Sequence, residues 1–365
     1  MPAAGEQAPL KPRRDPALNT APDDDPALAA PEDDRIALRR RRRRKRGRNA
    51  CLFGLLAGLA GLVAGRLGGL WIAFDVFAQF TPQFATIAAA CLLGLVMPVA
   101  RALTAVVLIV AGLIGIGVWP HVQASRHEAA LAAPADHRAV RIMSFNASLE
   151  NTNNLAIAEE IGRQDPDIAV IVEIGREKRP LMEALKARYP YQEDCIHLDF
   201  CYLAILSKFP IVDFESHSKW RGPPVVRATF GPELGGLTVI GTHLIRFPHQ
   251  RSQLIQMSEL GSFASKFMGP RIVAGDFNAT PFSRLLATFE NAGKLRRLTW
   301  WTPSWPARFA LAQLAIDHIY ASDQVQVLRE PRIGGNAGSD HYPVIVDIGV
   351  PTKLAAQAST LVTGE

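Results

Sequence analysis

An apolar region at residues 50–119 limits what this chain of 365 residues can fold into more than any other feature. It divides into three stretches, residues 50–74, 84–100 and 102–119. Each stretch has about 17 or more residues, which is close to the length that crosses the hydrocarbon core of a bilayer. A signal peptide is a poor alternative, because the region is too long and repeats three times. The sequence therefore predicts three transmembrane helices.

The charges around the apolar region predict its orientation. Nine of the ten residues from Arg39 to Arg48 are basic, and they directly precede the first stretch. Such a run also suits a nucleic-acid patch or a localisation signal, but beside a membrane span the positive-inside rule explains it better. Three crossings then place residues 120–365 outside the cytoplasm. We expect a multi-pass protein of the inner membrane with a periplasmic C-terminal domain.

Composition divides the rest of the chain into further parts. Residues 1–49 hold 13 Lys and Arg against 8 Asp and Glu and are rich in Ala and Pro, which predicts a disordered, basic, cytoplasmic tail. Residues 120–139 are polar and Ala-rich, and we expect a linker. Residues 140–350 form the expected catalytic domain, and residues 351–365 a flexible tail.

Short apolar runs and helical segments follow one another between residues 140 and 350 without strict alternation. This mixture predicts an α/β fold in which two mixed β-sheets pack together and helices cover their outer faces, a four-layer α/β sandwich. The expected strands are 141–148, 168–175, 201–207, 225–230, 237–243, 271–276, 316–321 and 342–348. The expected helices are 153–163, 178–188, 250–266 and 282–291.

Polar residues lie at the ends of the predicted strands, where loops can expose them. A carboxylate within an apolar strand is costly unless it is paired or binds a metal, and a single such residue is readily explained as a structural group. Eight at strand ends are hard to explain in that way. Hard oxygen ligands together with imidazoles can hold Mg²⁺ and activate water against a phosphate. The eight residues are Asn146, Glu173, His243, Asp276, Asn278, Asp317, Asp340 and His341.

The motifs around these residues are similar to those of the endonuclease/exonuclease/phosphatase superfamily, over about residues 138–350. Each motif alone is weak, but their order and completeness make the resemblance specific. The resemblance implies a metal-dependent hydrolase of phosphoester bonds. With the three predicted spans, the chain resembles a membrane-anchored bacterial branch of the superfamily. The matching stretches are Met143–Asn146, Val172–Glu173, Ala204–Ser207, Thr242–Leu244, Gly275–Asn278, Ile316–Ile319 and Ser339–His341.

The resemblance also implies a metal site. Asn146 and Glu173 would hold the catalytic cation, and Asp340 would join them directly or through water. The cation would be Mg²⁺, with Mn²⁺ or Ca²⁺ as alternatives.

The remaining residues take catalytic and substrate-binding roles in this family. Asp276 would align or deprotonate the attacking water, and Asn278 would contact the phosphate. His341 would polarise a phosphate oxygen, with Asp317 fixing its tautomer, and His243 would add a further phosphate contact. The implied mechanism is in-line attack by water. Asp276 and His341 both stay candidates for the general base.

The substrate class stays open between nucleic acid, a phospholipid headgroup and a small soluble phosphoester. Residues 138–350 hold 23 Lys and Arg against 22 Asp and Glu, so the domain lacks the charge of a tight nucleic-acid binder. The membrane anchor, with the bilayer as partner, favours a headgroup, and so does a loop with Trp300, Trp301 and Trp305. A catalytically silent binding module is the alternative to an enzyme, although every motif residue is present.

Cys195 and Cys201 are six positions apart in the expected catalytic domain. They read either as small buried residues or, if the domain lies outside the cytoplasm, as a disulfide. His318 reads as a structural histidine rather than a member of the site.

Overall fold

The structure is a computed structural model that describes residues 32–97, 99–125, 131–219, 222–308 and 314–352. Contacts between residues divide the chain into two units, residues 1–51 and 52–365. The expectations for residues 1–31 and 353–365 lie outside the described residues.

The first sheet has six strands and places two parallel strands at its centre. β1 (His137–Asn146) pairs in parallel with β2 (Ile168–Val172), and helix α5 (Asn154–Gln164) connects them. The other neighbours in the sheet are antiparallel. Its spatial order is β11 (Gln326–Ile333), β12 (Val344–Pro351), β1, β2, β4 (Leu203–Ser207) and β3 (Tyr191–Asp194).

The second sheet repeats this plan. β7 (Thr238–His243) pairs in parallel with β8 (Arg271–Asp276), and α7 (Gln250–Ala264) connects them. The other neighbours are again antiparallel. Its order is β5 (Ile211–His217), β6 (Val225–Phe230), β7, β8, β10 (Asp317–Ala321) and β9 (Arg296–Arg297).

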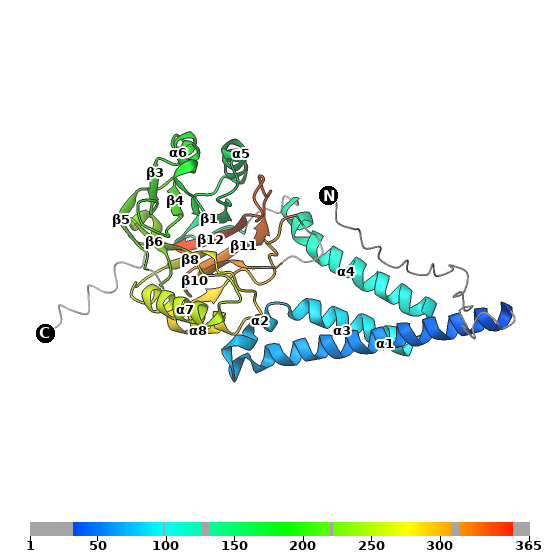
Figure 1. Ribbon diagram of the computed structural model, residues 1–365. Coiled ribbons are helices and arrows are strands. Elements are labelled where there is room, and N and C mark those ends of the chain that lie inside the picture. Colours follow the sequence, from blue (N-terminus) through cyan, green and yellow to red (C-terminus); the bar gives the residue numbers. More distant parts are fainter. Residues whose placement is uncertain (1–31, 98, 126–130, 220–221, 309–313, 353–365) are drawn as a thin grey trace, which may run out of the picture. The chain divides into compact units, whose positions relative to one another are not determined.

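The two sheets pack face to face and helices cover their outer faces, as Figure 1 shows. Val170, Val239 and Ile272 belong to the buried cluster between the sheets. A second cluster joins the first sheet to α5 and α6 (Arg179–Leu185), and a third joins the second sheet to α7 and α8 (Leu285–Gly293). The predicted sandwich of two mixed sheets flanked by helices is confirmed.

Most element boundaries differ from the predicted ones by a few residues at the ends. The shift is largest at β1, which begins at His137 rather than Arg141. The described residues also form four single turns of 3-10 helix: η1 (Leu67–Gly69), η2 (Ile72–Phe74), η3 (Arg176–Lys178) and η4 (Pro232–Leu234).

The helices before the sandwich differ from the prediction in number and extent. α1 (Glu32–Arg66) is one continuous helix, α2 (Asp75–Ala78) is a single turn, and α3 (Thr81–Val96) and α4 (Val99–Ser125) follow. One described helix, Glu32–Gly69, is long and apolar enough to cross a bilayer. The pair Ile72–Ala78 and Thr81–Val96 passes only as one span bent by 61°, and Ala102–Ile114 is shorter.

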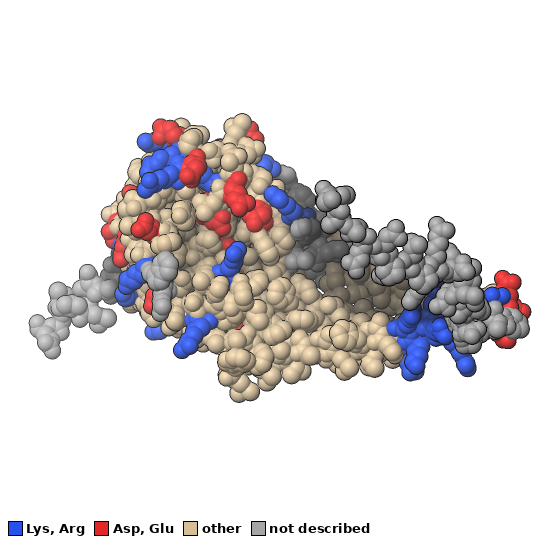
Figure 2. All heavy atoms as spheres, viewed as in Figure 1, with Lys and Arg blue, Asp and Glu red and all other residues tan. Residues whose placement is uncertain are grey.

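The prediction of three spans is therefore wrong by this criterion, because one described helix qualifies, or two if the bent pair counts. For α3 the physical reason is length. At 1.5 Å per residue, the 16 residues of α3 extend for about 24 Å, short of the ~30 Å hydrocarbon core. Figure 2 shows that charged side chains are sparse on the displayed face of these helices beyond the basic run.

Two predicted irregular segments are helical. Residues 32–49, expected to be disordered, form the first half of α1, whose first turn holds Glu32, Asp33 and Asp34. Acidic groups at that end favour a helix, and the Arg, Lys and Ala that follow have high helix propensity. The expected linker at residues 120–139 is shorter, since α4 continues to Ser125 and β1 begins at His137.

Glycines bring α1 and α3 into close contact. A Cβ at Gly58 would lie 2.8 Å from the carbonyl oxygen of Phe84, and one at Gly61 would lie 2.5 Å from the Phe84 ring. Gly54 of α1 faces Cys91 of α3. Small residues that let helix backbones approach are typical of helix pairs in membranes.

Gly241 on β7 has the same role between the two sheets. A Cβ there would lie 2.8 Å from the Val170 side chain of the opposite sheet and 2.8 Å from that of Val226. We expect Gly241→Ala to lower the free energy of unfolding by about 1–3 kcal/mol, because the added methyl group overpacks the core. Urea unfolding of the full chain in detergent, followed by tryptophan fluorescence, measures this change.

Gly162→Ala is the matched control. Gly162 lies in α5, and its added Cβ would meet only an Arg188 nitrogen, at 3.6 Å. Alanine within a helix should leave stability unchanged or raise it by about 0.5–1 kcal/mol. Equal effects of the two substitutions would contradict the packing role of Gly241.

Candidate active site

The site lies where the central strands of both sheets end. Asn146 ends β1, Glu173 directly follows β2, and His243 and Asp276 end β7 and β8. Because β7 and β8 are parallel, with His243 opposite Asp276, both side chains lie at the same edge. β10 runs the other way, so its first residue, Asp317, pairs with Asp276 at that edge.

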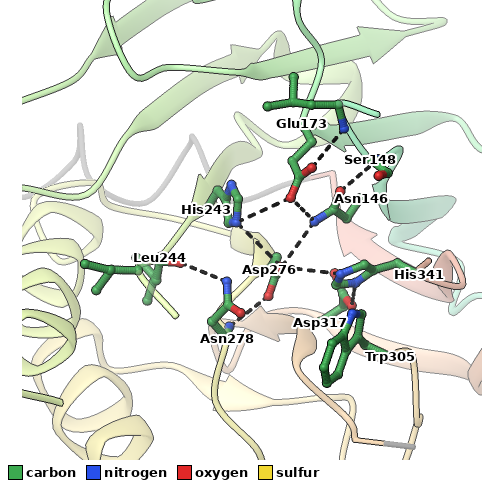
Figure 3. Close-up of polar contacts among 12 residues, drawn as sticks. Asn146, Ser148, Glu173, His243, Leu244, Asp276, Asn278, Trp305, Asp317 and His341 are labelled. Atoms are coloured by element: carbon green, nitrogen blue, oxygen red, sulfur yellow. Dashed lines mark hydrogen bonds and ion pairs between the residues drawn. The ribbon is translucent and has the colours of Figure 1, made fainter. Parts of the chain in front are cut away.

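The Asp276 carboxylate lies at the centre of the predicted site residues (Figure 3). Its Oδ1 accepts the Asn278 backbone N–H at 2.8 Å, and its Oδ2 accepts from Asn146 Nδ2 at 3.2 Å. His243 Nε2 lies 3.6 Å and His341 Nε2 3.9 Å from the same Oδ2. Residues from both sheets therefore converge on one oxygen atom.

Glu173 forms the opposite wall with Asn146. Glu173 Oε1 accepts from Asn146 Nδ2 at 2.9 Å, and Oε2 accepts from the Leu149 backbone N–H at 2.9 Å. His243 Nε2 lies 3.9 Å from Oε1. Glu173 has φ of 58°, in the left-handed region that costs free energy for a non-glycine residue. The fold thus holds this carboxylate in a strained conformation that points it toward the site.

Asn278 is strained as well and is held from two sides. Its φ is 49°, and its Nδ2 donates to the Leu244 carbonyl oxygen at 3.0 Å. Its own carbonyl oxygen accepts from Gln253 Nε2 of α7 at 2.8 Å. These contacts fix the loop that follows Asp276.

His341 and Asp317 form a buried pair. His341 Nδ1 and Asp317 Oδ2 are 2.8 Å apart, and both side chains are almost fully buried. Burial disfavours the imidazolium, but the Asp317 carboxylate outweighs it and raises the pKa of His341 to about 10. At neutral pH, His341 is therefore a cation whose Nε2–H faces Asp276.

The pKa values of two further groups in the site, Asp276 and His243, shift in opposite directions. Burial, reinforced by Asp317, raises the pKa of Asp276 to about 8. Burial lowers the pKa of His243, and the nearby Glu173 carboxylate opposes this shift. The site therefore combines a protonated imidazole, a neutral imidazole and a carboxyl group close to its titration point at neutral pH.

Asp340 lies beside this group. Its Oδ2 accepts from the Trp305 indole Nε1 at 3.1 Å, and the carbonyl oxygen of Asp340 accepts from the Ala307 backbone N–H at 2.7 Å. A cavity of about 600 Å³ opens onto the site. Its lining includes Glu173, His243, Asp276, Asn278, Trp305, Asp340 and His341. The structure thus brings all eight predicted residues to one place, with Asn146 and Asp317 buried behind the cavity wall.

The described residues offer one group of metal-binding side chains. Ligand atoms of Asp276, Asp317 and His341 lie within 4.8 Å of one another. The buried Asp317 Oδ1 has no hydrogen-bond partner in the described part of the chain. This group differs from the predicted ligands Asn146, Glu173 and Asp340, which stay a prediction.

Neighbouring residues that sequence reasoning left without a role support the site. Ser339 Oγ donates to the Asn146 carbonyl oxygen at 2.7 Å and accepts the His341 backbone N–H at 3.1 Å. It links the loop before β12 to the end of β1. Its position within the Ser-Asp-His motif was the only signal in the sequence.

His318 is structural, as expected from the sequence. The strand alternation of β10 turns it away from Asp317, and its Nε2 lies 2.8 Å from the Ala279 carbonyl oxygen. Its Nδ1 lies 3.1 Å from Thr299 Oγ1, and burial lowers its pKa to about 4. Of the three tryptophans in the preceding loop, Trp305 lines the cavity and Trp300 is exposed.

Cys195 and Cys201 are joined by a disulfide bond in the structure. Both residues are fully buried in the cluster between the sheets. The bond closes the loop between β3 and β4, next to the strand that supports Glu173.

The pair of Asp317 and His341 can be tested by titration. We expect nuclear magnetic resonance of the histidine side chains to give His341 a pKa near 10, and Asp317→Asn to lower that pKa by about one unit or more. Since the folded pKa exceeds the ordinary 6.5, protonated His341 adds stability that is present below pH 6.5 and is lost as pH rises toward 10.

His217 is the internal reference for this titration, because burial lowers its pKa and the nearby charge that most opposes this shift is Glu215 rather than Asp317, so its pKa should not respond to Asp317→Asn. A His341 resonance that titrates near 6.5 in both proteins would contradict the charged pair.

This chain is similar to several known proteins. The model of the Endonuclease/Exonuclease/phosphatase family matches residues 143–341. A UPF0294 protein of Vibrio vulnificus strain YJ016 is 32% identical over 121 residues, which is 32% of this chain and 40% of that protein. The match thus spans less than half of that relative.

Among solved structures, sphingomyelinase C from Streptomyces griseocarneus is 18% identical, with a TM-score of 0.46 over 57% of this chain and 99% of that one. An endonuclease/exonuclease/phosphatase from Bacteroides vulgatus is 17% identical, with a TM-score of 0.48 over 58% and 99%. The family model matches more than half of the chain, so this protein is a member of the Endonuclease/Exonuclease/phosphatase family.

Proposed function

We propose that this family member is a membrane-anchored hydrolase that cleaves a phosphodiester or phosphomonoester by in-line attack of water, with Mg²⁺ as cofactor and Mn²⁺ or Ca²⁺ as alternatives. One observation carries the proposal. Asn146, His243 and His341 all lie within 3.9 Å of Asp276 Oδ2, at the edge of an open cavity. Such a group can hold a water molecule and a phosphate together.

The residues present fit a divalent cation. Four carboxylates gather in and behind the cavity, and the buried Asp317 Oδ1 lacks a partner in the described part of the chain. Hard oxygen donors of this kind suit Mg²⁺. We propose that Asn146, Glu173 and Asp340 would hold it, and when bound it would supply positive charge to the phosphate and to the attacking water.

The pKa shifts separate the two candidates for the general base. His341 has a raised pKa of about 10, so it is charged at neutral pH and donates a hydrogen bond to a phosphate oxygen. Asp276, with a pKa near 8, titrates close to neutral pH, where a general base works best. A nearby cation would lower that pKa and favour the carboxylate. We therefore assign the base to Asp276.

The remaining residues orient the substrate. Asp317 holds the Nδ1–H of His341, so that Nε2–H points into the cavity. Asn278 is fixed by its contacts to Leu244 and Gln253, and we propose that it contacts the phosphate. His243, whose pKa is lowered, adds a neutral donor on the other side.

Three observations support an anchored domain outside the cytoplasm. The helix Glu32–Gly69 is long and apolar enough to cross a bilayer. A run of basic residues precedes its apolar half, as expected for a cytoplasmic end. The Cys195–Cys201 disulfide suits an oxidising compartment such as the periplasm.

The substrate class stays a choice between nucleic acid, a phospholipid headgroup and a small phosphoester. The near balance of charges over residues 138–350 gives little support to tight nucleic-acid binding. The anchor and the tryptophan at the cavity favour a phospholipid headgroup as the second candidate. The assembly of all eight residues in one place weakens the alternative that the domain is a catalytically silent binding module.

Hydrolysis tests the proposal. We expect the full chain in detergent with Mg²⁺ to cleave bis-p-nitrophenyl phosphate, single-stranded DNA or phospholipid headgroup esters, and Asp276→Asn to lower kcat by about 10³-fold through loss of the base. EDTA should stop the reaction and Mg²⁺ or Mn²⁺ should restore it.

Asp199→Asn is the matched control, because it removes an exposed carboxylate of the same domain. It should retain full activity. Near-normal turnover by Asp276→Asn, or full activity in the chelator, would reject the assignment.

Localisation has its own test. A phosphatase reporter that is active only outside the cytoplasm, fused after Glu365, should be active if residues 120–365 are periplasmic. The same reporter fused before Met1 should be inactive, because the basic tail stays inside. A well-expressed but inactive C-terminal fusion would reverse the proposed orientation.

A further inference from the structure

We propose that Asp75 and Gln79 are positioning residues of the active site, although they lie between the apolar helices and more than 190 residues before Asp276 along the chain. The junction turn is defined here as residues 75–80, which comprise α2 and the two residues before α3. The Asn278 loop is residues 277–284, which connect β8 to α8.

Asp75 is 1% exposed and directs both carboxylate oxygens at the end of the Asn278 loop. Its Oδ1 accepts the Arg284 backbone N–H at 2.8 Å, and its Oδ2 accepts from Ser283 Oγ at 2.6 Å. Arg284 occupies the N-cap position of α8, and its own side chain caps nothing. Asp75 therefore supplies, from a distant part of the chain, the acceptor and negative charge that stabilise a helix N-terminus.

Gln79 holds the other end of the loop. It is fully buried, and its Oε1 accepts the Thr280 backbone N–H at 2.7 Å. Its carbonyl oxygen lies 3.4 Å from Thr280 Oγ1. Thr280 is two residues beyond Asn278, so this contact fixes the chain directly after the strained residue that faces the substrate.

The junction turn also touches the second loop of the site. The rings of Phe80 and Phe247 meet edge to face at 5.6 Å, and Phe247 lines the active-site cavity. Phe247 belongs to the loop after His243, whose Leu244 carbonyl oxygen holds the Asn278 side chain. The turn thus contacts both loops that position Asn278.

The end of the first apolar helix is packed against the same place. A Cβ at Gly69 would lie 3.3 Å from the Arg284 guanidinium, and one at Gly68 would lie 3.2 Å from the Asp75 backbone nitrogen. A buried carboxylate and a buried amide are costly unless both find partners. Here the oxygens of Asp75 and Gln79 accept hydrogen bonds from the Asn278 loop, and Gln79 Nε2 donates to Asp75 Oδ2. A catalytic domain produced without residues 75–80 would lose both sets of acceptors.

The test uses the full chain in detergent and compares Asp75→Ala, Gln79→Ala and the conservative Asp75→Asn. Gln83→Ala is the matched control, because Gln83 lies one turn further on and its buried Oε1 has no partner among the described residues. Two quantities are measured: hydrogen exchange of the amides in residues 278–284, and kcat with KM for the hydrolysis proposed above, on which the catalytic part of this inference rests.

We expect the alanine variants to accelerate amide exchange at Thr280 and Arg284 about tenfold, as for the loss of a helix cap. We expect kcat to fall about tenfold or more while KM changes little, because Asn278 is misplaced rather than removed. Asp75→Asn keeps one acceptor oxygen and should recover part of both effects. Gln83→Ala should match the wild type.

Unchanged exchange and kcat in the alanine variants would overturn the inference, as would a loss of protection throughout the sandwich, which would indicate a role in folding alone. Hydrogen exchange of the amides can be measured without any catalytic turnover. A wild type that hydrolyses nothing, with accelerated exchange confined to 278–284 in the variants, would reject the proposed function and still support the contact between turn and loop.

Discussion

The burial of several carboxylates and imidazoles around Asp276 is the constraint on which the site depends. Asp276, Asp317 and Glu173 would repel one another if each were charged and alone, so the fold surrounds them with donors. His341 carries its proton because Asp317 lies 2.8 Å away, and Asn146 donates to both Glu173 and Asp276. The high free energy of such a cluster is what makes it ready to exchange protons or accept a cation.

The two-sheet architecture makes this cluster possible. Each sheet has a parallel pair at its centre, connected by one helix, and each pair ends at the same edge. The first sheet contributes Asn146 and Glu173, and the second contributes His243 and Asp276. No single sheet holds the complete site, because its two walls come from opposite sides of the sandwich core.

The sequence predicted the sandwich, and it singled out residues that the structure brings together, because both depend on local patterns. Continuous apolar strands such as 168–172 and polar residues at their ends are visible in one dimension, and the family motifs supplied their order. Contacts over long distances were not visible. Nothing near Ser339 or Trp305 in the sequence shows which residue it will meet, and Asp75 reads as part of a polar turn until the fold places it at the N-terminus of α8. The three predicted spans were overstated because a count of apolar residues does not show where a helix begins and ends, and α3 has only 16 residues.

The close approach of the sheets at Gly241 has a consequence for the evolution of the reaction. Glu173 follows a strand of the first sheet and Asp276 ends a strand of the second, so the gap between these two walls depends on how the two sheets pack at that edge. Side chains deep in the hydrophobic core, such as Val170 and Val226 beside Gly241, therefore set the width available to a phosphate and its cation. In this fold, substitutions that never touch the substrate can change the width of substrate that the site accepts, because the thickness of the hydrophobic core sets the width of the active site.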